Sequence, residues 1–194
     1  GARPSDINHM FITHLHMDHY IDLGHFIMMR WIHRSDEPLH LYGSQGLQRM
    51  VDLLLEMHGP DVELRQITRS LPRPAPNVIV HEISEGPILE TPNGVKVSAF
   101  RVEHYPLDEP FGFRFDTKNK SIAFSGDTCP SENLIKHTHK VDVLVHESTE
   151  YTKWDAPDVD HSHKVKTHTH PEKLGFVAQD AEPGLLIATH LMPR

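Results

Sequence analysis

Four short apolar segments of this chain end close to a histidine or an aspartate. By composition the segments are buried strands, and the polar residues that follow them are His14, Asp127, His146 and His190. A sheet fixes the positions of side chains that leave the ends of its strands, so metal ions and catalytic groups are commonly held there. The pattern therefore predicts a mixed α/β fold that carries its chemistry where loops leave the sheet.

Helices and hairpins are expected around these strands. The spacing of apolar residues predicts three helices, over residues 20–34, 44–58 and 171–180. Further strands are predicted over residues 78–83, 87–90, 95–102, 111–115 and 121–125. Gly59-Pro60 is expected to stop the second helix, and Asn93-Gly94 to turn a hairpin. The polar stretch 155–169 is expected to be a surface loop.

Composition excludes several classes of protein. The chain has 194 residues, enough for one domain with a sizeable core, and its net charge of −8 disfavours a surface built to neutralise a phosphate backbone. The single cysteine, Cys129, excludes an internal disulfide and a multi-cysteine zinc site. No apolar run reaches the roughly 18–20 residues of a membrane helix. A soluble protein is expected. Its compartment is left open, and the cytoplasm is favoured over the others.

Histidine is unusually abundant, with 18 residues, and its densest cluster is His14-x-His16-x-Asp18-His19. In an extended loop His14 and His16 point the same way and can share one ion, while Asp18 and His19, at the start of a helix, can turn to a second. Imidazole and carboxylate without thiolate suit catalytic zinc or another borderline divalent metal. A solvated histidine patch is the alternative, but the apolar strand that enters the cluster argues against it.

These motifs resemble those of the metallo-β-lactamase superfamily, in particular its ribonuclease Z and arylsulfatase-like branch. The matching segments are Thr13–His19, Phe124–Thr128, Leu144–Thr149 in the place of the HEAT motif, His168-Thr169, and Ala188–Leu191. The resemblance implies a four-layer αββα sandwich in one domain over residues 1–194. Family members carry strands before the first motif and a final strand after the last. We therefore expect this sandwich to be incomplete at both termini.

The resemblance also implies roles for individual residues. It assigns a first metal site to His14, His16 and His104, a second to Asp18, His19 and His190, and a shared position to Asp127. Two divalent ions are expected, zinc first, with Mn²⁺ or Fe²⁺ as alternatives. They would acidify a shared water and provide the attacking hydroxide. Asp18 would orient the hydroxide or take its proton, and His168, held by Glu147 or His146, would protonate the leaving group. For His146 and Glu147, a structural role at the end of the strand is as well supported as a direct role in catalysis.

Within this family the sequence favours a small-molecule substrate with a sulfate, phosphate, carboxylic or lactone ester bond. His104 and Asp127 are 23 positions apart, too close for the inserted arm with which ribonuclease Z grips tRNA. The residues that follow His190 and the net charge of −8 also favour a small-molecule substrate. A ribonuclease Z-like phosphodiesterase acting on RNA is the main alternative; a β-lactamase and a non-catalytic metal-binding module are less favoured. A homodimer is one expectation for the oligomeric state.

Overall fold

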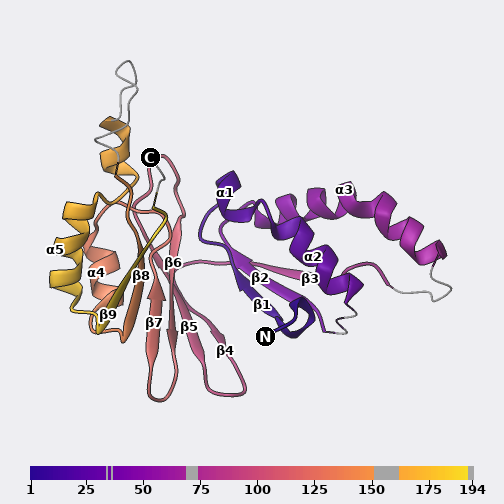
Figure 1. The fold of residues 1–194 in the computed structure, drawn as a ribbon, viewed down its shortest axis with the longest axis horizontal. Helices are drawn as coiled ribbons and strands as arrows, with labels where there is room; N and C mark the ends of the chain where they lie inside the picture. The colour runs from indigo at the N-terminus through magenta and orange to yellow at the C-terminus, as the bar shows by residue number, and fades with distance from the viewer. Residues whose placement is uncertain (34, 36, 69–73, 151–161, 192–194) are drawn as a thin grey trace. The chain divides into compact units, whose positions relative to one another are not determined.

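The computed structural model describes residues 1–33, 35, 37–68, 74–150 and 162–191. They form two compact units, Gly1–Ile83 and Ser84–Arg194, and each unit has its own sheet and its own helices (Figure 1). The predicted mixed α/β fold is confirmed. No helix among the described residues is both long enough and apolar enough to cross a bilayer.

The first unit is built on a three-stranded parallel sheet. Its strands, in spatial order, are β1 (His9–Phe11), β2 (Leu39–Gly43) and β3 (Val78–Glu82), and its helices are α1 (Met17–Tyr20), α2 (Leu23–Ile32) and α3 (Leu47–Thr68), after a 3-10 turn over Pro4–Asp6. Parallel strands need long crossovers, which α2 and α3 provide. Leu39 and Leu41 pack in one buried cluster with Ile27 of α2 and Val51 of α3. This packing anchors the loop that leaves β1.

The helix predicted to stop at Gly59-Pro60 continues to Thr68, so that prediction is wrong. Proline removes one backbone donor and so costs the helix a hydrogen bond. The second half of α3 nevertheless buries Val62 beside Met28 and Trp31 of α2. Tertiary packing thus offsets a local signal that would end an isolated helix. The helix predicted over 20–34 is also divided, into α1 and α2.

The second unit is built on a six-stranded sheet in sequence order. Its strands are β4 (Gly86–Glu90), β5 (Lys96–Arg101), β6 (Phe111–Asp116), β7 (Ser121–Phe124), β8 (Val143–Glu147) and β9 (Leu185–Thr189). Neighbours from β4 to β7 are antiparallel, whereas β7, β8 and β9 are parallel. The two predicted hairpins, β4–β5 and β6–β7, are confirmed. The parallel half brings the ends of β7, β8 and β9 to the same edge of the sheet.

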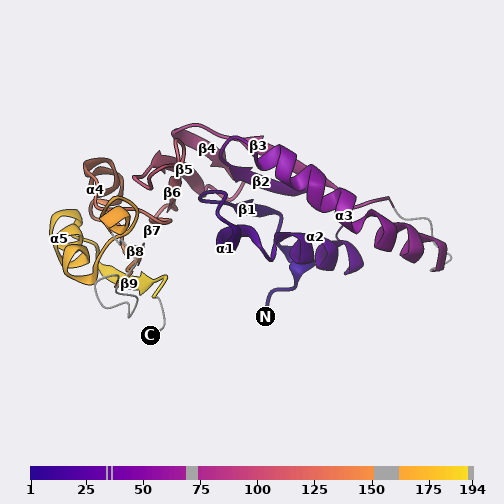
Figure 2. The ribbon, with the colours of Figure 1, turned by 90° about the horizontal axis from the view of Figure 1, so that it is seen from above.

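Two helices of the second unit pack together beside this sheet. They are α4 (Glu132–Thr138) and α5 (Pro171–Ala181), which lie next to each other in both views (Figures 1 and 2). Leu134 and Val177 from these helices enclose Phe100 of β5. The predicted helix 171–180 is confirmed as α5, with proline in its first turn. The predicted loop 155–169 instead contains a 3-10 helix over Ser162–Lys166, and its first part lies outside the described residues.

Glycine is required at one position of the second sheet. A Cβ at Gly112 would collide with the ring of Phe100 and lie 2.8 Å from the carbonyl oxygen of Phe124. We expect Gly112→Ala to lower the free energy of unfolding by about 1–3 kcal/mol, because neither the buried ring nor the backbone can move freely. Urea unfolding measures this change.

Gly175, in α5, provides the matched control because a Cβ there meets no atom within 4 Å. Gly175→Ala should raise the free energy of unfolding by about 0.5–1 kcal/mol through helix propensity. Equal effects of the two substitutions would contradict the packing described for Gly112.

Candidate metal centre

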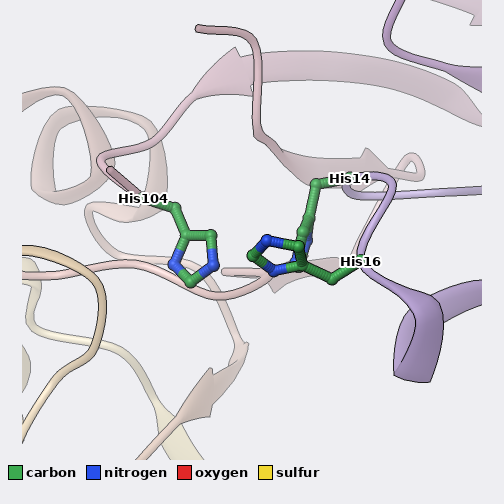
Figure 3. A group of neighbouring side chains, drawn as sticks. All are labelled: His14, His16 and His104. Atoms are coloured by element: carbon green, nitrogen blue, oxygen red, sulfur yellow. The ribbon is translucent and has the colours of Figure 1, made fainter. Parts of the chain in front are cut away.

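In the first unit, three histidines of the predicted metal site, His14, His16 and His19, lie on the loop that leaves β1 and on α1. His14 Nε2 lies 3.0 Å from His16 Nδ1, and the two rings meet edge to face (Figure 3). The ring centroid of His19 is 4.1 Å from that of His14, and His19 Nε2 is 3.4 Å from Asp18 Oδ2. The four predicted ligands of this unit are therefore neighbours. Asp18 and His19 lie at the start of a helix, as predicted.

In the second unit, His104 follows β5 and is held by a backbone carbonyl (labelled in Figure 3). Its Nδ1 lies 2.6 Å from the carbonyl oxygen of Thr167, and the side chain is buried. Nδ1 must donate in this bond, so the neutral imidazole carries its lone pair on Nε2. That is the tautomer in which a histidine binds a metal through Nε2.

Asp127 and His190 follow β7 and β9, two strands whose ends meet at the same edge of the sheet. The Asp127 side chain is buried, and its Oδ2 lies 3.5 Å from His190 Nε2. The residue before Asp127, Gly126, has a φ of 63°, a left-handed conformation that glycine adopts easily. His190 has a φ of 53°, which is uncommon for a residue with a side chain and is typical of functional positions.

Glu147 of β8 and His168 form a buried pair in the second unit. His168 Nδ1 lies 2.9 Å from Glu147 Oε1, and Glu147 is 1% exposed. The same oxygen accepts hydrogen bonds from the backbone N–H groups of Thr128 and Thr169, at 3.0 and 3.2 Å. Of His146 and Glu147, the two residues predicted to hold His168, Glu147 is the one that contacts it.

The donor sets have the chemistry and the spacing that a divalent metal ion needs. Metal–nitrogen bonds of about 2.0–2.1 Å in a tetrahedral site place ligand nitrogens about 3.3 Å apart. His14 and His16 approach that spacing at 3.0 Å. The candidate ligand atoms of His104, Asp127 and His168 lie within 4.8 Å of one another, as do those of Glu147, His168 and His190. These residues fit a zinc-type ion, although His168 lies among ligands rather than apart from them.

The site contains residues that the sequence analysis did not single out. Thr149 lies between Glu147 and His190, and Thr167, Thr128 and Thr169 supply backbone partners to His104 and Glu147. The only sequence signal for Thr149 was its place in the motif 144–149. Hydroxyl and backbone groups of this kind become visible only once the chain segments are brought together.

His146, next to Glu147, has a different role. Adjacent residues of a strand point to opposite faces of the sheet, so His146 points away from His168. It is 0% exposed, its Nδ1 is 2.7 Å from the carbonyl oxygen of Glu147, and its Nε2 has no hydrogen-bond partner among the described residues. Burial lowers the pKa of His146 below its ordinary value of 6.5.

This burial makes the protein less stable in acid. The unfolded chain takes up a proton at His146 near pH 6.5, whereas the folded chain does so only at a lower pH. We expect His146 to reduce the free energy of unfolding of the metal-free protein by up to about 1.4 kcal/mol per pH unit below about pH 6.5. Urea unfolding between pH 7 and pH 5 measures the slope.

The slope should be smaller in His146→Gln than in the wild type. His139, which is exposed, provides the control, since His139→Gln removes an imidazole without changing the buried site. Identical pH dependences for the wild type and His146→Gln would contradict the assignment.

Known proteins resemble this chain over almost its whole length. The model of the family described as "Beta-lactamase superfamily domain" matches residues 1–191. Ribonuclease Z of Mycobacterium sp. (strain KMS) is 29% identical over 196 residues, which cover all of this chain and 68% of that protein. A putative ribonuclease Z of Mycobacterium tuberculosis (strain CDC 1551 / Oshkosh) is 28% identical over 95% of this chain and 84% of its own length.

Solved structures share the fold. Human tRNase Z, short form, superposes with a TM-score of 0.73 at 21% identity, covering 99% of this chain and 75% of that protein. The metallo-β-lactamase fold protein YhfI from Bacillus subtilis gives a TM-score of 0.68 at 17% identity, covering 98% of this chain and 66% of that protein. The chain thus spans between 66% and 84% of the length of these four proteins.

These relatives favour the RNA alternative of the sequence analysis over the small-molecule ester interpretation. The short spacing between His104 and Asp127 does not set this chain apart from a protein named ribonuclease Z. The first mycobacterial relative aligns over 196 residues with the 194 of this chain, which leaves no room for a long insertion there either. The match over residues 1–191 shows that the chain belongs to the beta-lactamase superfamily, a family of hydrolases, and that its fold is that of the metallo-β-lactamases.

Proposed function

We propose that this protein is a metal-dependent hydrolase that cleaves phosphodiester bonds in RNA. The observation that carries the proposal is the match, over the whole chain, to relatives named ribonuclease Z. The donor sets of the two units support it, because imidazoles and a carboxylate are what a catalytic zinc-type ion requires. The chain retains a ligand-competent residue at every predicted metal position, which disfavours a non-catalytic module.

The residues predicted from the sequence would supply the ligands of a dinuclear site. We assign the first ion to His14, His16 and His104 and the second to Asp18, His19 and His190, with Asp127 shared. Zinc is the expected metal, with Mn²⁺ or Fe²⁺ as alternatives. Bound divalent ions would polarise the scissile phosphate and acidify water.

The chain's own residues would then move the protons. Glu147 accepts a hydrogen bond from His168 Nδ1–H, which orients the ring. The protonated ring can donate Nε2–H to the oxygen that leaves the phosphate. Asp18, on α1, would orient the attacking water or accept its proton.

The small-molecule ester reading makes a different prediction, so a substrate panel separates the two. The zinc-loaded protein would receive a tRNA with a 3′ extension, bis(p-nitrophenyl) phosphate, p-nitrophenyl acetate and p-nitrophenyl sulfate. We expect the highest kcat/KM on the RNA, weaker cleavage of the nitrophenyl phosphodiester, and loss of both activities in Asp127→Ala. Efficient cleavage of the acetate or the sulfate without cleavage of the RNA would favour the ester interpretation.

Contaminating ribonucleases need a separate control. Many of them attack with the 2′-hydroxyl of the RNA itself, whereas a hydrolase that uses water does not need this group. RNA with a 2′-O-methyl group at the scissile nucleotide should therefore still be cleaved by this protein. Complete protection by the methyl group would contradict hydrolysis by water.

A further inference from the structure

Thr149 lies between the histidine and the carboxylate on which the proposed site depends. Its Oγ1 is 3.1 Å from Glu147 Oε2 and 3.3 Å from His190 Nδ1. The residue is 1% exposed, and its backbone N–H donates to the carbonyl oxygen of Thr169 at 3.0 Å. All of these groups belong to the second unit. The hydroxyl is therefore held in place and contacts both partners.

The directions of these hydrogen bonds follow from the number of protons available. Glu147 Oε2 and the carbonyl oxygen of His190 both only accept, and the carboxylate is charged and nearer, at 3.1 Å against 3.4 Å, so the single hydroxyl proton of Thr149 goes to Glu147 Oε2. The hydroxyl oxygen then has only lone pairs to offer His190, and Nδ1 must supply the proton. The neutral ring of His190 therefore carries its lone pair on Nε2. This nitrogen faces the carboxylate Oδ2 of Asp127 at 3.5 Å, an arrangement of two electron-pair donors that a bound cation would stabilise.

The backbone of His190 has an uncommon, left-handed conformation. A φ of 53° is unfavourable for a residue with a side chain. The carbonyl oxygen of His190 also lies near the same hydroxyl, at 3.4 Å from Thr149 Oγ1. Because the hydroxyl proton is directed to Glu147, Thr149 holds this residue through the ring nitrogen Nδ1 rather than through the carbonyl.

We propose that Thr149 is a positioning residue that fixes the tautomer and orientation of His190, so that Nε2 is presented for metal binding. Through Glu147, whose other oxygen meets His168 Nδ1, the same hydroxyl links this ligand to the proposed proton donor. The proposal rests on the proposed function for the presence of a metal ion. The tautomer itself is a property of the metal-free protein.

The tautomer is measured first, by ¹⁵N NMR of the metal-free wild-type protein labelled at histidine. We expect His190 to carry its proton on Nδ1. The signature of a proton on Nε2 would overturn the proposal, whatever happens to any variant. Because no metal is present, this result does not depend on the proposed activity.

Zinc affinity is measured next, by competition with a chelator, in Thr149→Val and Thr149→Ser. The valine has the shape of threonine without the hydroxyl, and we expect it to weaken zinc binding about 10- to 100-fold, as loss of a hydrogen bond to a ligand typically does. The serine keeps the hydroxyl and should bind within about threefold of the wild type. Equal zinc affinities for the valine variant and the wild type would overturn the proposal.

Thr138 offers a matched control for the loss of a buried hydroxyl. It is 0% exposed and donates to the carbonyl oxygen of Leu134 in α4, outside the motifs. Thr138→Val should lower the melting temperature without changing zinc affinity or the His190 tautomer. If Thr138→Val weakened zinc binding as much as Thr149→Val does, general destabilisation would be the cause. That result would refute the role of Thr149. Absence of zinc binding by the wild type would instead refute the proposed function.

Discussion

Asp127→Ala is expected to release both metal ions. Asp127 is 4% exposed, its Oδ2 lies 3.5 Å from His190 Nε2, and its carboxylate shares a ligand cluster with His104 and His168. Because we assign it to both ions, no other single substitution should remove as much metal. Removing the ions should also reduce RNA cleavage by about 10³-fold or more, given that a bound ion contributes several kcal/mol to the transition state.

Metal content after dialysis, measured by elemental analysis, tests this expectation directly. Asp116→Ala is the matched control, because Asp116 is an aspartate of the same sheet whose carboxylate pairs with Arg114. The control should keep its metal. Retention of one tightly bound ion by Asp127→Ala would show that Asp127 serves only one of the two positions.

His168→Ala should leave the metal content unchanged and slow turnover. The expected loss in kcat is about 10²- to 10⁴-fold, the usual contribution of a positioned proton donor. His168 Nδ1 is committed to Glu147, so the ring is oriented to act through Nε2. Steady-state kinetics on RNA, together with metal analysis of the same preparation, measures both quantities.

The control for this substitution is His139→Ala, which removes an exposed histidine and should change neither value. Metal loss in His168→Ala equal to that in Asp127→Ala would contradict the assignment. It would identify His168 as a ligand, a role that its position among His104 and Asp127 permits.

Much of the fold could be predicted from local sequence. The hairpins β4–β5 and β6–β7 and the helix α5 depend on turn residues and on a proline in the first turn, which act over a few positions. The helix α4 was missed because it has only 7 residues and depends on the cap at Ser131. The length of α3 could not be predicted, because the contact of Val62 with α2 is tertiary.

The candidate site likewise contains some residues that local sequence reveals and others that it does not. His14, His16, Asp18 and His19 lie within six positions, so their spacing alone indicated a metal site. The carbonyl that holds His104 is 63 positions away, and Thr149 and His190 are 41 positions apart. Spacing carries no information at such separations. Substrate choice was also beyond local sequence, since the 23 positions between His104 and Asp127 suggested a small ester and the relatives favour RNA.

The most direct test of the proposed chemistry is RNA cleavage in water enriched in ¹⁸O, with mass spectrometry of the products. Metal-dependent hydrolysis predicts one ¹⁸O atom in the product phosphate, a requirement for zinc, and no product from Asp127→Ala. Zinc-loaded protein that leaves RNA uncleaved, or cleavage that persists in Asp127→Ala, would contradict the account.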